Sequence, residues 1–102
     1  MAFRCSKTNG RRRLAEWQAW INLHRAELTA IGLPPEVYVD ESRWLDFLEN
    51  GHLHWHESSG FEFAHLSRKQ LAALRRFLER EYASAEQCPK LLQWVRVRCE
   101  GS

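Results

Sequence analysis

The sequence predicts an α+β fold in one small domain, in the order helix, helix, β-hairpin, helix, helix, with the helices packed on one face of the hairpin. Apolar residues recur at helical spacing in 11–31 and 67–83, and they alternate with histidines in 52–56. A chain of 102 residues, 44% hydrophobic and 27% charged, has the size of a single globular domain. We therefore expect one domain over residues 1–102, with flexible ends at 1–9 and 100–102.

The first helix is expected over residues 11–31. Its apolar stripe contains most large hydrophobic residues of the segment, namely Leu14, Trp17, Ile21, Leu28 and Ile31, with Trp20 at the edge. Gly32 suits the left-handed residue that ends many helices, and Pro34 and Pro35 prevent continuation. His24 lies within the stripe, where a core histidine bound to a carbonyl or carboxylate is expected rather than a catalytic one.

The second helix has two possible starts. It can begin with Pro35 at its first position and run to Asn50, where Gly51 stops it. Because the segment 37–39 has strand-like propensity, Asp40 or Ser42 can instead cap a shorter helix. The expected apolar face consists of Val37, Trp44, Phe47 and Leu48.

Residues 52–63 predict a β-hairpin with two unlike faces. Successive side chains of an extended chain point to opposite faces, so the three histidines of 52–56 lie on one face and the residues between them on the other. The apolar face should contain Leu53, Trp55 and Phe61 and lie on the helices. The outer face should contain His52, His54, His56 and Glu62.

The register of the hairpin depends on the length of its loop. A three-residue loop over 58–60, with Gly60 left-handed, places Trp55 opposite Phe63. A five-residue loop places Trp55 opposite Phe61 instead. Both registers preserve the same two faces.

The third helix is expected to begin at a capping box of Ser67 and Gln70 and to run to Tyr82 or Ala83. Its buried face consists of Leu71, Leu74, Leu78 and Tyr82, with Phe77 at the edge. The opposite face carries Lys69, Arg76 and Arg80, which suit either a solvated surface or the binding of phosphate or an acidic partner.

The last segment, 89–99, fits two structures. Leu91, Leu92, Val95 and Cys99 form a helical stripe, whereas Val95, Val97 and Cys99 alternate with arginines as in a strand. Pro89 is a good helix start, so we favour a helix.

The charge of the chain is unevenly distributed. Residues 1–25 hold six basic and one acidic side chain (+5), residues 26–65 one basic and eight acidic (−7), and residues 66–102 eight basic and four acidic (+4). The segments can complement one another internally, or they can offer a surface of two signs to a partner.

Composition also limits the cellular location. No stretch reaches the roughly 18 apolar residues of a membrane span, and residues 1–7 lack the apolar run of a secretory signal. The three cysteines are odd in number and widely spaced, which argues against a disulfide framework. We expect a cytoplasmic protein with no membrane partner.

The histidine run is the one feature that could carry chemistry. We expect no metal or other cofactor. The alternative is a zinc site of His52, His54, His56 and Glu62, because imidazoles at alternate strand positions can share a zinc ion. The run also resembles the signature of the histidine triad nucleotide hydrolases and transferases. That resemblance implies His54 as the nucleophile on a nucleotide α-phosphate, with His52 and His56 orienting it. Where the family's signature continues with two apolar residues, this chain has Glu57 and Ser58.

Nucleic-acid binding is a further alternative, because three arginines at 11–13 precede Trp17 and Trp20. The acidic segment 26–65 argues against it, since it would repel a polyanion.

The function we favour is that of a small protein-binding or regulatory module without catalytic activity, which binds a protein partner or a second copy of this chain. Tryptophan and arginine are enriched in binding hot spots, and five tryptophans are many for this length. The candidate binding residues are Trp20, Leu23 and Trp94, expected to form an exposed apolar patch, together with Lys69, Arg76 and Arg80.

Overall fold

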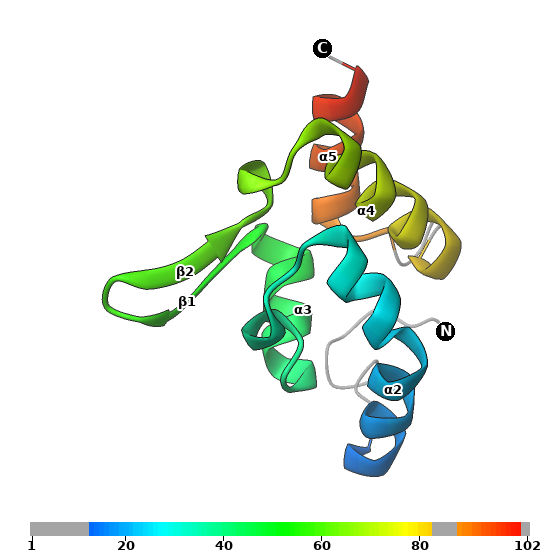
Figure 1. The fold of residues 1–102 in the computed structure, drawn as a ribbon, viewed down its shortest axis with the longest axis vertical. Coiled ribbons are helices and arrows are strands. Elements are labelled where there is room, and N and C mark those ends of the chain that lie inside the picture. The colour runs from blue at the N-terminus through cyan, green and yellow to red at the C-terminus, as the bar shows by residue number, and fades with distance from the viewer. Residues whose placement is uncertain (1–12, 83–87, 101–102) are drawn as a thin grey trace.

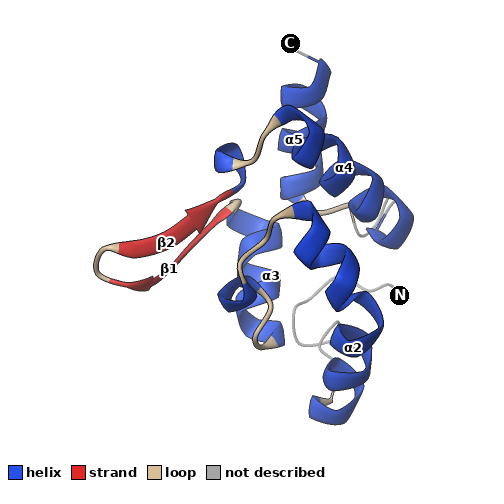
Figure 2. Cartoon of the chain, viewed as in Figure 1, coloured by secondary structure: helices blue, strands red, loops and turns tan. Residues whose placement is uncertain are grey.

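The computed structural model describes residues 13–82 and 88–100. It contains helices α2 (Leu14–Ile31), α3 (Glu41–Asn50), α4 (Arg68–Tyr82) and α5 (Lys90–Glu100) and an antiparallel hairpin of β1 (His52–His56) and β2 (Ser59–Glu62) (Figures 1 and 2). Short 3₁₀ helices, η1 (Pro35–Val37) and η2 (Phe63–His65), precede α3 and α4. The predicted α+β fold and element order are confirmed. Of the ends expected to be flexible, 1–9 and 101–102 lie outside the described residues, and Glu100 ends α5.

The helix termini follow from local capping. Gly32 and Gly51 end α2 and α3 with left-handed φ values of 104° and 76°. The Asp40 side chain accepts a hydrogen bond from the Arg43 N–H at 2.8 Å, so the shorter version of the second helix is correct. Pro35 begins only the 3₁₀ turn η1, because the extended backbone of Asp40, with φ −141°, interrupts helical hydrogen bonding.

Both C-terminal helices agree with the sequence. The Gln70 side chain accepts from the Ser67 N–H at 2.8 Å, and Ser67 Oγ accepts from the Gln70 N–H at 3.2 Å, which is the predicted capping box. The segment that also suited a strand is the helix α5, whose Leu91, Leu92 and Val95 are buried.

The hairpin has neither of the two predicted registers. Leu53, not Trp55, lies opposite Phe61, because the chain reverses through the two-residue turn 57–58 and Gly60 belongs to β2. A register shift between His54 and His56 absorbs the extra residue as a bulge. Gly60 does not have the expected left-handed φ; in the described chain the glycines with positive φ are Gly32 and Gly51. Phe63 lies in η2, and its N–H donates to the Gly51 carbonyl at 3.0 Å.

The two faces of the hairpin are as predicted. His52, His54, His56 and Glu62 are exposed, and Leu53, Trp55 and Phe61 are half-buried. The Phe61 ring lies 5.9 Å from that of Phe47, which joins the hairpin to α3. Figure 1 shows the hairpin extending away from the helices, with β1 beside α3. The core behind it is built from all four described helices, with Trp17, Trp44, Phe47 and Phe77 among its largest fully buried side chains.

Candidate functional site

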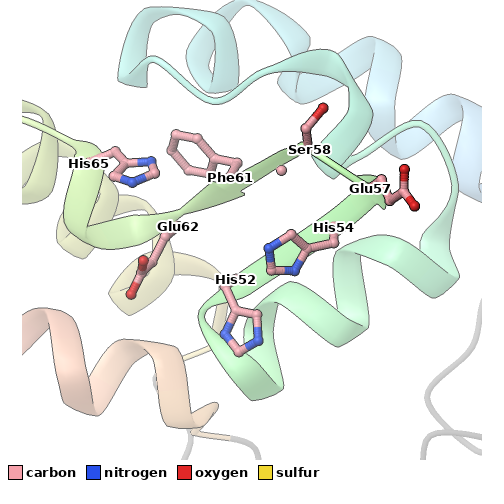
Figure 3. A pocket seen from close by; sticks show the side chains of 8 residues that line it. His52, His54, Glu57, Ser58, Phe61, Glu62 and His65 are labelled. Carbon is pink, nitrogen blue, oxygen red and sulfur yellow. The ribbon is translucent and has the colours of Figure 1, made fainter.

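The hairpin carries an open pocket of about 530 Å³, lined from both of its faces (Figure 3). It is lined by His52, His54, Glu57, Ser58, Gly60, Phe61, Glu62 and His65. The ring centroids of His52 and His54 are 5.9 Å apart, and His52 Nδ1 lies 3.1 Å from the Asn50 carbonyl oxygen. Figure 3 shows Glu62 on the side of β2 that faces these two rings, and Phe61 with His65 on the other side. His52 and His54 of β1 therefore lie on one side of the hairpin, and His65 of η2 lies on the other.

The zinc alternative gains no support from this geometry. Within residues 13–82 and 88–100, no group of three or more His, Cys, Asp or Glu side chains is arranged to hold a metal ion. His56 is separated from His54 by the bulge, which breaks the even spacing on which a shared ion would depend. The side chains of Glu62, His52 and His54 are all exposed.

The nucleotide hydrolase resemblance is likewise unsupported by the surroundings of His54. That family has several strands before its triad, whereas the described residues that precede His52 form α2, η1 and α3. His52, His54 and His56 are all exposed on a hairpin. Glu57 lines the same pocket, where its charge is unfavourable for a phosphate group.

A second candidate surface lies where α5 meets the two ends of the hairpin, at Gly51 and η2. The Trp94 ring stacks on Phe63, with ring centroids 6.2 Å apart and an interplanar angle of 21°. Trp94 nevertheless remains 38% exposed, and Val97, one turn further along α5, is 66% exposed. Gly51 lies so close to the indole ring that a Cβ atom there would be 3.0 Å from Trp94 Cζ3. We call Trp94, Val97 and Phe63 the Trp94 patch. The patch predicted from the sequence included Trp94 but neither Val97 nor Phe63, although helical spacing alone places Val97 beside Trp94.

The expectation that Trp20 is exposed is wrong. Its ring is buried, with 9% exposure, between Trp17 at 4.8 Å and His24 at 4.5 Å, because the edge of the α2 stripe faces Trp44 and Phe77 rather than water. Leu23 is exposed as predicted, at 76%. Leu23 lies on α2 and Trp94 on α5. Because Trp20 is buried, it does not join these two exposed residues into one apolar patch.

The predicted cationic residues of α4 differ in their availability. Lys69 and Arg76 are exposed. Arg80 donates two hydrogen bonds to the Glu27 carboxylate, at 2.6 and 3.2 Å, and one to Glu81. These hydrogen bonds, chiefly those to Glu27, raise the pKa of Arg80. Arg80 therefore joins α4 to α2.

His24 packs among core rings, as expected, but it is only partly buried and lies too far from the nearest carboxylate for the expected hydrogen bond. Its ring packs against Trp20 and Phe77, and its Nε2 lies 3.9 Å from Glu81 Oε1.

The structure does not support base stacking by the tryptophans of α2, on which the nucleic-acid alternative partly depends. Trp17 and Trp20 are both buried, so neither ring is available to stack on a base. Residues 11 and 12 of the arginine run lie outside the described residues.

Comparison with known proteins identifies no relative: no family model, curated protein or solved structure matches the chain. None of the helices in the described ranges is long and apolar enough to cross a lipid bilayer.

Proposed function

We propose that this chain is a small cytoplasmic protein-binding module without catalytic activity, and that the Trp94 patch is its contact surface. The observation that carries the proposal is the state of Trp94, whose indole ring is held in place yet is more than one third exposed. The other three tryptophans of the described helices, Trp17, Trp20 and Trp44, are buried in the core.

An exposed tryptophan ring whose orientation is already fixed favours the binding of a partner protein. The stack on Phe63 and the contact with Gly51 fix the orientation of the indole ring before any partner arrives. Binding then costs little side-chain entropy, which is one reason why tryptophan dominates binding hot spots. Val97 extends the apolar area along α5 and offers a partner a second contact.

The test is to purify the tagged chain from its own host and identify bound proteins by native mass spectrometry. A partner that binds through the patch should be retained by the wild type and lost in Trp94→Ala and Val97→Asp. Leu14→Ala is the matched control, because Leu14 is 75% exposed on α2, away from the patch. If the partner is a second copy, the wild type gives twice the mass of the chain, and the two patch variants give the single mass.

The proposal fails if Trp94→Ala and Val97→Asp retain the same bound proteins, in the same amounts, as Leu14→Ala. Circular dichroism of each variant confirms that loss of binding is not loss of folding.

A further inference from the structure

We infer that the partner of the Trp94 patch presents an acidic segment that carries a large apolar residue. This inference rests on the proposed function, because it names the class of partner for that same surface.

The exposed side of α5 combines apolar and cationic side chains. Residues four positions apart on a helix lie one above the other, so Lys90 and Arg98 stand one turn before and one turn after Trp94, with Val97 beside them. All four side chains are exposed, and the helix buries Leu91, Leu92 and Val95 on its other side. This stripe, Lys90, Trp94, Val97 and Arg98, contains no acidic residue.

The charge around the stripe has the same sign. Helices α4 and α5 together carry eight basic and three acidic side chains, a net +5. Several of these cations are already paired, since Arg75 and Arg96 contact Glu79, and Arg80 contacts Glu27. Lys90 has no ion-pair partner within residues 13–82 and 88–100. A partner with acidic side chains would complement this surface and be attracted to it over a distance of about 10 Å.

The acidic region next to the stripe shows why the partner should be a short acidic segment and not a nucleic acid. Residues 35–65, which form η1, α3, the hairpin and η2, carry one basic and seven acidic side chains, a net −6. Trp94 contacts both Gly51 and Phe63, so this acidic region begins directly beside the stripe (Figure 1). A nucleic-acid strand would carry its negative charge across that boundary, whereas an acidic peptide can end before it.

The experiment measures binding of fluorescein-labelled peptides to the purified chain by anisotropy at low salt. The probe repeats Glu-Glu-Leu, and comparison peptides repeat Gln-Gln-Leu and Lys-Lys-Leu; a labelled single-stranded oligonucleotide is the fourth ligand. We expect the wild type to bind the acidic peptide about tenfold more tightly than the neutral one, with affinity falling as salt is added.

Variants separate the acidic preference from the apolar contact. Lys90→Gln should weaken the acidic peptide about threefold and leave the neutral peptide unchanged. Trp94→Ala should weaken both peptides, because it removes the apolar contact. Arg25→Gln is the charge-matched control, since Arg25 is exposed on α2, and it should change neither affinity.

The possible failures are distinguishable. Equal affinity for the acidic and neutral peptides, with both weakened by Trp94→Ala, overturns the acidic preference and keeps the proposed function. Tighter binding of the oligonucleotide or of the basic peptide overturns the inference, as does a loss in Arg25→Gln equal to that in Lys90→Gln. Absence of any binding to the acidic peptide at low salt overturns it as well.

Discussion

Gly51 and Trp94 are in direct contact across the junction of the hairpin and α5. A Cβ atom at Gly51 would lie 3.0 Å from Trp94 Cζ3 and 3.1 Å from Phe63 Cδ1, which is closer than carbon atoms normally approach. The same glycine ends α3 with a left-handed φ of 76°. One residue therefore both ends the helix and makes room for the exposed tryptophan ring.

Gly51→Ala should therefore destabilise the chain by at least about 2 kcal/mol, because a left-handed alanine costs about 1–2 kcal/mol and the close contacts add to it. Urea denaturation measures this free energy of unfolding. In a Trp94→Ala background the cost should fall by about 1 kcal/mol, since one of the two rings is gone.

Gly32→Ala is the control for the Gly51→Ala variant. Its φ of 104° carries a similar backbone cost, but the nearest atoms belong to the amide end of the Gln70 side chain, which can shift by giving up its exposed hydrogen bond with the Ser67 N–H. A loss in Gly32→Ala as large as that in Gly51→Ala, or no coupling between Gly51 and Trp94, would contradict the packing argument.

The buried indole of Trp44 depends on Tyr82 for its hydrogen bond. Trp44 Nε1 donates to the Tyr82 hydroxyl at 3.0 Å, and Trp44 is fully buried. Tyr82→Phe should lower the free energy of unfolding by about 1–3 kcal/mol, because it leaves a buried N–H group without an acceptor. Tyr38→Phe is the control, as the Tyr38 hydroxyl lies a long 3.4 Å from Thr29 Oγ1. Equal losses in the two variants, measured by urea denaturation, would refute the prediction.

Asp40, and not Ser42, should determine the start of α3. Asp40→Ala removes the side-chain oxygen that accepts from the Arg43 N–H and should cost about 1 kcal/mol. Ser42→Ala, at an exposed position inside the first turn of α3, should cost less than about 0.5 kcal/mol. Thermal unfolding of both variants checks this, and a larger loss in Ser42→Ala would reassign the cap.

The helices and the hairpin faces could be predicted because their signals are local. The Ser67–Gln70 box, the glycines at 32 and 51 and the alternation of 52–56 each involve residues within a few positions of one another. The register could not be predicted in this way. A bulge between His54 and His56 and a two-residue turn give the same faces as longer loops, so the pattern of hydrophobic residues does not distinguish them.

The candidate site was harder to predict because it depends on contacts between distant segments. Trp20 and Trp94 were both candidates for an exposed patch, since five tryptophans are many for a chain of this length. Their difference arises from tertiary packing: Trp20 faces Trp44 and Phe77, whereas Trp94 lies against Phe63 at the molecular surface. Periodicity reports the direction of a side chain but not which element covers it.

The Glu79 carboxylate should make stability depend on pH. Its pKa is lowered, chiefly because Arg96 Nε donates a hydrogen bond to it at 2.9 Å, and also because Arg75 Nε donates at 3.3 Å. A lowered folded-state pKa means that this contribution is present above the pKa of an unfolded glutamate, about 4.3, and is lost as the pH falls through the folded value. Glu79→Gln should therefore be less stable than the wild type at neutral pH, and the difference in unfolding free energy should shrink in acid. Glu36→Gln, at an exposed carboxylate, should match the wild type throughout, and a Glu79→Gln difference that is independent of pH would exclude this ion-pair origin.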